Sequence, residues 1–228
     1  RSRGMSFQSS RAACFVMSPA FLQFEVANYQ INSPSHARII APPRRPTEAL
    51  QVIRDLPIVD ELLERHAVVL GSNRRAYTNH VYRVVNLCAE LAGHDADTLQ
   101  KLGIAGVFHD IGLFADDTFD YLEPSRARAH IYLEETGLPQ WRDEVGAMVY
   151  WHHKITPVPK AMGPFVEAFR KADWIDVLHG AITCGIPRSK IREIFNAFPN
   201  SGFHWLLVKL SVKRLLTHPW NPLPILRW

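Results

Sequence analysis

The sequence predicts an all-α protein, and three observations support this fold class. Apolar residues recur at the i, i+3, i+4 and i+7 spacing of helices along most of the chain after residue 46. Helix start signals (Ser, Asn, Asp or Pro) and stop signals (Gly or Pro) bound these segments. No alternating pattern long enough for a β-strand is present, and no internal repeat is visible. We therefore expect a helical bundle.

Each expected helix has its own boundary signal. Asn73, with Ser72 before it, offers an N-cap for a long helix to about Leu91, which Gly93 ends. Asp95 or Asp97 caps the next helix. In chain order, the expected helices cover residues 47–54, 57–69, 73–91, 95–109, 125–136 (capped by Ser125, stopped by Gly137), 139–153 (opened by Pro139), a segment that starts at Gly163-Pro164 and carries Asp173, 190–198 and 203–217.

Length and composition favour one helical domain with extensions. A chain of 228 residues with 47% hydrophobic content can bury a sizeable core. We assign this domain to residues 47–217. Residues 1–46 are Ser-rich and then Pro-rich, which predicts an irregular N-terminal extension, and residues 218–228 read as an irregular C-terminal tail.

Charge and cysteine content narrow the functional classes. The net charge of +4 is scattered over the chain, which suits a small anionic substrate and gives no indication of nucleic-acid binding. Three cysteines without a C-x-x-C spacing favour a reducing compartment, so we expect a cytoplasmic protein. The apolar run over residues 12–24 is too short to span a bilayer, so no membrane contact is expected. A homo-oligomer is left open.

An imidazole and a carboxylate stand side by side in an apolar stretch. His109 shares a helical face with Leu99, Leu102 and Gly106, and Asp110 follows it directly, so both side chains should turn toward the interior. A charge taken out of water costs several kcal/mol (about 3–5) unless it is paired or bound to a metal. The pair therefore needs a partner.

Three further potential ligands lie on helical faces that look buried. His80 shares its face with Val84, Cys88 and Leu91, and His152 and Asp173 occupy similar apolar faces of two later helices. Imidazole nitrogens and carboxylate oxygens together form a ligand set for a divalent transition metal such as Fe, Mn, Zn, Co or Ni. The sequence therefore predicts a metal site between helices.

The order of these residues resembles a known family. His80, then His109-Asp110, then Asp173 is similar to the H…HD…D signature of the HD-domain metal-dependent hydrolases, an all-helical superfamily. The resemblance extends from about Leu56 to His179. Its supporting segments are Thr78-Asn79-His80-Val81-Tyr82-Arg83-Val84, His109-Asp110-Ile111-Gly112, Val149-Tyr150-Trp151-His152-His153-Lys154 and Lys171-Ala172-Asp173-Trp174-Ile175-Asp176.

The resemblance implies roles for individual residues. The metal ligands would be His80, His109, Asp110 and Asp173, and Asp110 would also orient or deprotonate the nucleophile. His152, His153 and Lys154 lie at a helix end beside this site. We predict catalytic roles for Asp110, His152 and Lys154, and substrate contacts for His153 and for Arg83, which lies one turn after His80.

One metal ion is preferred over two. Family members with a second ion use extra histidines between the HD pair and the last Asp, and some of these oxygenate rather than hydrolyse. His130 with His152 or His153 would fill that role here. Two departures limit finer assignments: Leu113 stands where several nucleotidases of the family carry an acid, although Asp116 and Asp117 follow closely, and a Gly-Tyr-Pro motif is lacking.

The predicted function is phosphoester hydrolysis on a nucleotide or small phosphorylated metabolite. Residues 123–138 also resemble the matching helix of the cyanamide-hydratase-like branch, which adds water to a nitrile-type bond. The alternatives are therefore such a hydratase, a di-iron oxygenase of the same fold and, from another class, a signalling or scaffold module with a degenerate site.

Overall fold

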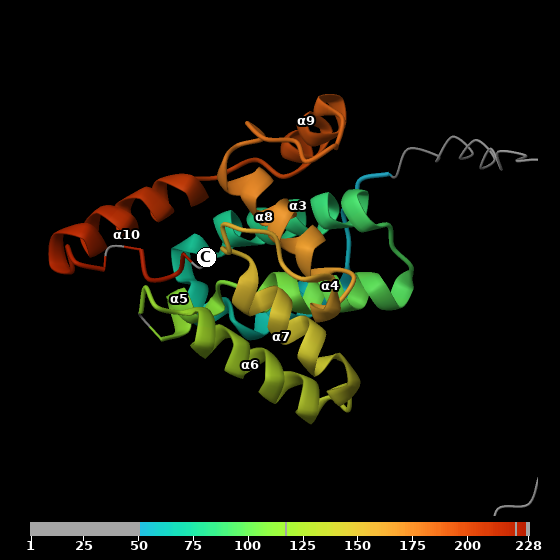
Figure 1. Ribbon diagram of the computed structural model, residues 1–228, viewed down its shortest axis with the longest axis horizontal. Coiled ribbons are helices and arrows are strands. Elements are labelled where there is room, and N and C mark those ends of the chain that lie inside the picture. Colours follow the sequence, from blue (N-terminus) through green and yellow to red (C-terminus); the bar gives the residue numbers. More distant parts are fainter. Residues whose placement is uncertain (1–50, 117, 222, 227–228) are drawn as a thin grey trace, which may run out of the picture. The chain divides into compact units, whose positions relative to one another are not determined.

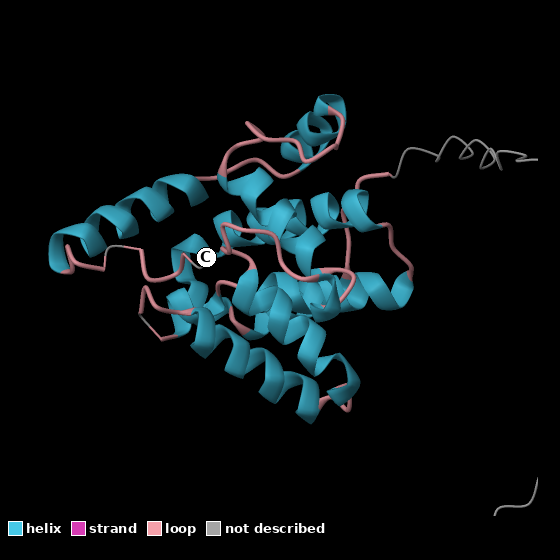
Figure 2. Cartoon of the chain, in the orientation of Figure 1, coloured by secondary structure: helices cyan, strands magenta, loops and turns pink. Residues whose placement is uncertain are grey.

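The computed structural model describes residues 51–116, 118–221 and 223–226. Regular structure in these ranges is helical and includes no β-strand, as Figure 2 shows, so the all-α prediction is confirmed. The elements are α1 (Pro57–Arg65), α2 (Ala67–Leu70), the 3₁₀ turn η1 (Gly71–Asn73), α3 (Arg74–Ala92), α4 (Ala96–Phe108), α5 (Ile111–Ala115), α6 (Leu122–Glu135), η2 (Pro139–Trp141), α7 (Arg142–Trp151), η3 (Lys160–Met162), α8 (Val166–Val177), α9 (Arg188–Ala197) and α10 (Phe203–Thr217).

Four helices form the centre of this domain. Helix α3 packs on α4, α4 on α7 and α7 on α8, and α8 closes the ring by packing on α3. Their facing side chains are aliphatic and fully buried, among them Val84, Ile104, Val149 and Ile175. In Figure 1, α6 runs beside α7, while α10 extends away from the four central helices. The ring determines which helix ends meet in the interior.

Several predicted helix boundaries are confirmed. The carboxylate of Asp95 accepts a hydrogen bond of 2.8 Å from the backbone N–H of Thr98, which caps the N-terminus of α4. Gly93 and Gly137 follow α3 and α6 with positive φ angles of 75° and 72°. This left-handed conformation is open to glycine at little steric cost, which explains why both helices stop there.

Other boundaries were predicted wrongly. Residues 51–56 are not helical, so the helix expected over 47–54 is absent from its described part, while residues 47–50 lie outside the described ranges. The helix expected over 57–69 is divided at His66, whose Nδ1–H donates to the Leu62 carbonyl at 2.8 Å. Helix α5 was not predicted, because five residues are too few to show a period.

Ser125 does not cap α6, which begins three residues earlier. Its side chain is buried inside the first turns of the helix, where Oγ accepts a 2.9 Å hydrogen bond from the backbone N–H of Gly112. A Cβ atom on Gly112 would lie 3.0 Å from both Ser125 Oγ and the Tyr121 carbonyl oxygen. The turn after His109-Asp110 is thus fixed against α6 by a contact that leaves no room for a side chain.

The described part of the C-terminal tail contains no helix, and Ile225 packs with Leu113, Tyr121 and Leu122. The extension predicted for residues 1–46 lies outside the described residues, and the domain division stays a prediction. Among the described helices, none combines the length and the apolar character needed to cross a membrane.

Candidate metal centre

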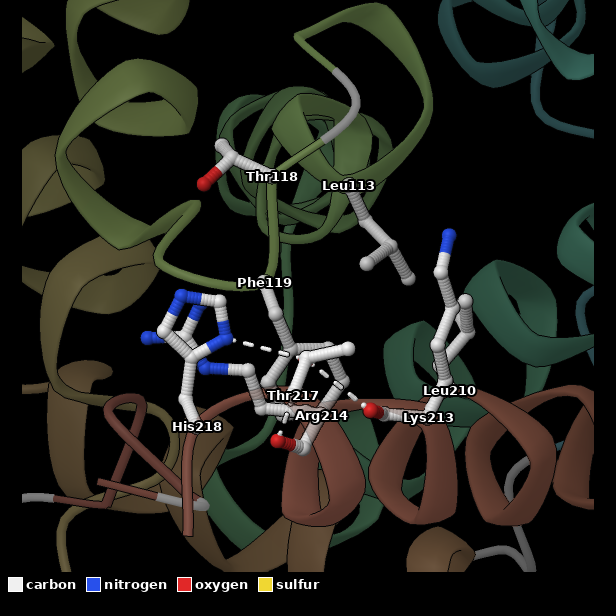
Figure 3. A pocket seen from close by; sticks show the side chains of 8 residues that line it. All are labelled: Leu113, Thr118, Phe119, Leu210, Lys213, Arg214, Thr217 and His218. Carbon is white, nitrogen blue, oxygen red and sulfur yellow. Dashed lines mark hydrogen bonds between the residues drawn. The ribbon is translucent and has the colours of Figure 1, made fainter. Parts of the chain in front are cut away.

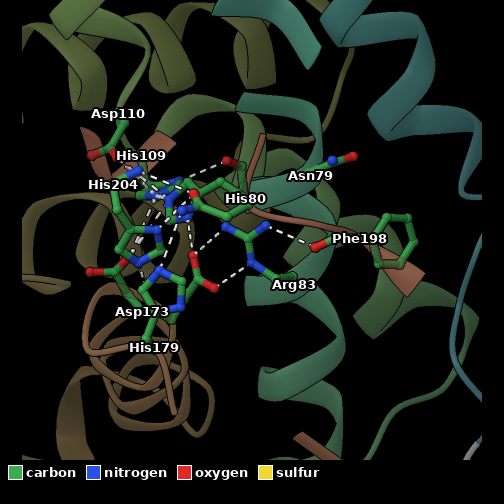
Figure 4. Close-up of polar contacts among 12 residues, drawn as sticks. Asn79, His80, Arg83, His109, Asp110, Asp173, His179, Phe198 and His204 are labelled. Carbon is green, nitrogen blue, oxygen red and sulfur yellow. Dashed lines mark hydrogen bonds and ion pairs between the residues drawn. The ribbon is translucent and has the colours of Figure 1, made fainter. Parts of the chain in front are cut away.

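The ring of helices brings together residues that are far apart in sequence. His80 comes from α3, His109 and Asp110 from the junction of α4 and α5, His152 from the end of α7 and Asp173 from α8. All five are buried, and none is more than 2% exposed. Figure 4 shows His80, His109, Asp110 and Asp173 directed toward one another. The predicted convergence of these side chains is therefore present.

The two imidazoles of the predicted ligand set present lone pairs to the same point. His109 Nδ1 lies 2.7 Å from the Gly106 carbonyl oxygen, and His80 Nδ1 lies 2.6 Å from Asp176 Oδ2. Both oxygens can only accept, so both Nδ1 atoms carry the proton and donate. The Nε2 atoms, which lie 2.8 Å apart, then carry lone pairs in the neutral rings. Such an arrangement needs a cation between them, either a proton or a metal ion.

Two carboxylates complete this set. Asp110 Oδ2 lies 3.4 Å from His109 Nε2 and 3.6 Å from His80 Nε2. Asp173 Oδ1 lies 3.8 Å and 3.7 Å from the same two nitrogens. Neither oxygen of Asp173 has a hydrogen-bond partner in the described part of the chain. Buried carboxylate oxygens without partners are costly, and two nitrogens with two oxygens suit a divalent transition metal. These residues therefore fit the predicted ion.

A second group of potential ligands shares Asp110. The ligand atoms of Asp110, His152 and His153 lie within 4.8 Å of one another, as do those of His80, His109 and Asp110. His152 Nδ1–H donates to the Val149 carbonyl at 2.7 Å, so Nε2 faces Asp110 Oδ1 at 3.2 Å. Neither of these two facing atoms has a hydrogen-bond partner among the described residues. Asp110 thus stands between two histidine pairs.

His130 belongs to neither group. Its ring lies between α6 and α7, where Nε2 would be 2.3 Å from a Cβ atom added to Gly146. His153 stands closer to the centre, with Nδ1 3.4 Å from Asp173 Oδ2 and Nε2 hydrogen-bonded to the Tyr121 hydroxyl at 2.9 Å. The structure therefore does not support His130 as a ligand of a second ion, and it offers His152 with His153 instead.

Burial and neighbouring charge shift the pKa values at this centre. Burial alone would lower the pKa of His80, but hydrogen bonds to Asp110 and Asp176 outweigh it and raise that pKa to about 9. Burial raises the pKa of Asp173 to about 7. His109 moves the other way, because burial lowers its pKa to about 3. A proton on His80 can thus occupy the point where the lone pairs meet.

The structure gives no support for the substrate contact predicted for Arg83. Its side chain is fully buried, and Nε and Nη2 both donate to Asp176, the latter at 2.9 Å. Nη1 donates to the carbonyl oxygens of Phe198 and Pro199 at 3.0 and 3.2 Å. Arg83 therefore neutralises and orients Asp176, which in turn accepts a hydrogen bond from His80. A guanidinium held in this way is a structural group.

The side chain of Lys154 contacts residues outside the two ligand groups. Its Nζ donates to Thr156 Oγ1 and lies 5.9 Å from the centroid of the Trp151 ring. No hydrogen bond or ion pair joins this ammonium group to a ligand residue in the described ranges, so the structure gives no support for a catalytic role. Asp116, considered as a replacement acid, pairs with Arg128 at 2.7 Å, and Asp117 lies outside the described residues.

Three residues of the centre were not assigned a role from the sequence. Asp176 lies three residues after Asp173 on the same face of the helix, and that spacing is the signal that could have identified Asp176. Tyr121 contacts His153 from the segment before α6, and the Phe203 ring stacks on His80 with centroids 4.0 Å apart. No local pattern marks either of these aromatic residues, because their positions depend on tertiary packing.

The comparisons with known proteins agree with this geometry. The family model described as HD domain matches residues 77–179, a range that contains all the histidines and aspartates of both ligand groups. No curated protein and no solved structure matched the chain. HD domains are all-α and bind divalent metals. The helical ring and the His/Asp cluster at its centre agree with these two properties. Residues 77–179 are thus an HD domain.

Proposed function

We propose that this protein hydrolyses a phosphoester in a small anionic substrate, a nucleotide or a phosphorylated metabolite. The observation that carries the proposal is the meeting of two imidazole nitrogens and two carboxylates at one buried point, with both oxygens of Asp173 lacking a hydrogen-bond partner in the described ranges. His80, His109, Asp110 and Asp173 would hold one divalent transition metal. Such an ion supplies Lewis-acid charge that lowers the pKa of water toward neutrality.

The charge at the centre suits a phosphate group. Asp176 is neutralised by Arg83, which leaves Asp110 and Asp173 as the carboxylates of the centre that face no permanent cation of the chain. A divalent ion balances these two charges, so an anionic substrate is not repelled. A phosphoester gains from cationic and donor groups on its oxygens during the reaction, whereas a neutral nitrile gains less.

Asp110 and His152 are the groups placed to handle the proton of the attacking water. One oxygen of Asp110 faces the two metal-ligand imidazoles, and the other lies 3.2 Å from His152 Nε2. Asp110 can therefore orient a water and accept its proton, and His152 can return that proton to the leaving oxygen. His153 is the most exposed histidine of the cluster at 8%, and we assign it the contact with substrate.

A centre with two ions is the alternative that a specific observation favours. Asp110, His152 and His153 place three ligand atoms within 4.8 Å of one another beside the first set. Two ions can stabilise both the attacking and the leaving oxygen of a phosphoryl group, and the oxygenase alternative also depends on this second group. The two arrangements differ in the role of His152. It binds metal in the two-ion centre, whereas in the one-ion centre it only transfers protons.

The experiment is a substrate screen of purified protein loaded with Fe, Mn, Zn, Co or Ni. Phosphomonoesters, nucleotides, cyclic nucleotides and small nitriles are offered to the wild type, to His109→Ala and to His130→Ala as the matched histidine control. We expect phosphate release by the wild type and by His130→Ala, and none by His109→Ala. Turnover of nitriles alone would contradict the proposal. A scaffold module would instead bind its partner equally well with His109→Ala.

A further inference from the structure

The outer face of α10 exposes five large apolar side chains. Helix α10 is one of the longer helices, yet Phe203 is its only buried residue. Its outward side chains form what we call the α10 stripe, in order Trp205 (73% exposed), Val208 (49%), Val212 (50%), Leu215 (50%) and Leu216 (77%). Single exposed apolar residues are ordinary, but a contiguous set of this kind marks an interaction surface.

The stripe is one continuous face that points away from the domain. Its members follow one another at i, i+3, i+7, i+10 and i+11, which places them on one side of a helix. The opposite side is turned to the domain, where Leu210 and Arg214 line a pocket of about 280 Å³ together with Leu113 and Phe119 (Figure 3). The α10 stripe therefore takes no part in packing the domain.

Positive charge accompanies the stripe, without any negative charge from this part of the chain. Residues 194–228 contain no Asp or Glu, whereas α10 carries Lys209, Lys213 and Arg214. Lys209 borders the stripe, and Lys213, one turn further on, lies at the rim of the pocket on the domain side; both are exposed. Trp220, just beyond the end of α10, is 97% exposed. Apolar residues and lysines on one helix, with one tryptophan on the helix and another just beyond it, are the features of a segment that lies at a membrane interface.

We propose that α10 docks on an anionic lipid surface, with the α10 stripe against the acyl-chain boundary and Lys209 and Lys213 at the headgroup phosphates. The helix would lie in the plane of the interface, which needs no span. The expectation of no membrane contact rested on the apolar run of residues 12–24, which is too short to span a bilayer, whereas a helix that lies flat in the interface needs no such length.

Charge disfavours the two partners that the protein itself could offer to the α10 stripe, namely a second copy of α10 and the segment of residues 1–50. Two α10 stripes packed antiparallel would gather Lys209 and Lys213 of both copies along one edge, and α10 has no carboxylate to offset them. Residues 1–50 carry six arginines and two glutamates, so this segment is also basic. An anionic surface is complementary to the helix in both its apolar and its charged character.

The test is co-sedimentation of the full chain with phosphatidylcholine vesicles that contain or lack phosphatidylglycerol. We expect binding only with phosphatidylglycerol, weakened by salt. Trp205→Ser with Leu216→Ser should reduce partitioning by more than about tenfold, since two large side chains no longer enter the lipid. Lys209→Gln and Lys213→Gln should each reduce it about fivefold. Val68→Ser is the matched control, because Val68 on α2 is 93% exposed and lies outside the stripe.

Each variant is first shown to keep the circular dichroism spectrum, melting temperature and metal content of the wild type. Vesicle binding that is absent, or equal in the stripe variant and the wild type, would overturn the proposal. Light scattering decides the second-copy alternative: a dimer that becomes monomeric with Trp205→Ser and Leu216→Ser would show that the α10 stripe is a subunit interface instead. The test does not depend on catalytic activity.

Discussion

His80 donates a 2.6 Å hydrogen bond from Nδ1 to Asp176, and this contact orients the imidazole toward the metal centre. Asp176 is in turn held by Nε and Nη2 of Arg83. These hydrogen bonds from Arg83 to Asp176 and from His80 to Asp176 fix the tautomer of His80. Nε2 is therefore the nitrogen that faces Asp110 and Asp173. A carboxylate behind a ligand histidine is how proteins orient that ligand and raise its basicity.

Replacement of Asp176 should therefore weaken metal binding without removing a ligand. We expect Asp176→Asn to lower metal affinity by about 10- to 100-fold, because the amide is a poorer acceptor for His80 Nδ1–H. Competition with a chromophoric chelator measures this change, with the exposed Asp143→Asn as the control. An unchanged affinity would mean that Asp176 does not position His80.

Arg83 should matter for stability rather than for substrate binding. Arg83→Met leaves Asp176 buried and without its guanidinium partner, which costs about 3–5 kcal/mol. The double variant Arg83→Met with Asp176→Leu removes both charges and should be the more stable of the two. Urea unfolding gives both free energies. Equal or greater destabilisation in the double variant would argue against an uncompensated charge as the cause.

The sequence was sufficient to predict which side chains meet at the centre but not the residues that hold them in place. His80, His109, Asp110 and Asp173 could be placed there because each lies on an apolar face at a helical period. Arg83 lies on the same turn of α3 as His80, so its charge alone could not distinguish a substrate contact from a buried partner of Asp176. Lys154 follows the histidine pair in sequence, yet the turn after α7 directs its side chain to Thr156.

The helical class was predictable because the apolar period extends over most of the domain. At the start of α6 the boundary was misplaced because a tertiary contact replaced a local one. Ser125 has the chemistry of an N-cap, but its hydroxyl accepts from Gly112 on the neighbouring turn. Helix α5 exists because Gly112 packs against α6, and five residues carry no period of their own.

Gly112 gives a direct test of that contact. Gly112→Ala would place a Cβ atom 3.0 Å from the Tyr121 carbonyl oxygen and from Ser125 Oγ. Because one of these neighbours is backbone, we expect a loss of about 1–3 kcal/mol in unfolding free energy. Thermal and urea unfolding measure it, with Gly137→Ala compared as a strained but open position. A fully stable Gly112→Ala would show that α5 and α6 are free to separate.

Metal binding should release protons, and affinity should rise with pH. In the metal-free protein the pKa of His80 is raised to about 9 and that of Asp173 to about 7. Below pH 9 an incoming ion must displace the His80 proton, and below pH 7 a second proton from Asp173, so the protonated forms oppose binding. Calorimetry in buffers of different ionisation enthalpy measures this release. Zero release below pH 7 would contradict the assignment.

The most direct measurement is the metal content of the purified protein by mass spectrometry after loading and dialysis. With one ion bound by His80, His109, Asp110 and Asp173, we expect one equivalent of transition metal in the wild type, in His152→Ala and in His130→Ala. We expect close to none in His109→Ala or Asp173→Ala. A content near two that falls to one in His152→Ala would establish the second ion at Asp110, His152 and His153. No metal in the wild type, or full retention by His109→Ala, would contradict the central claim.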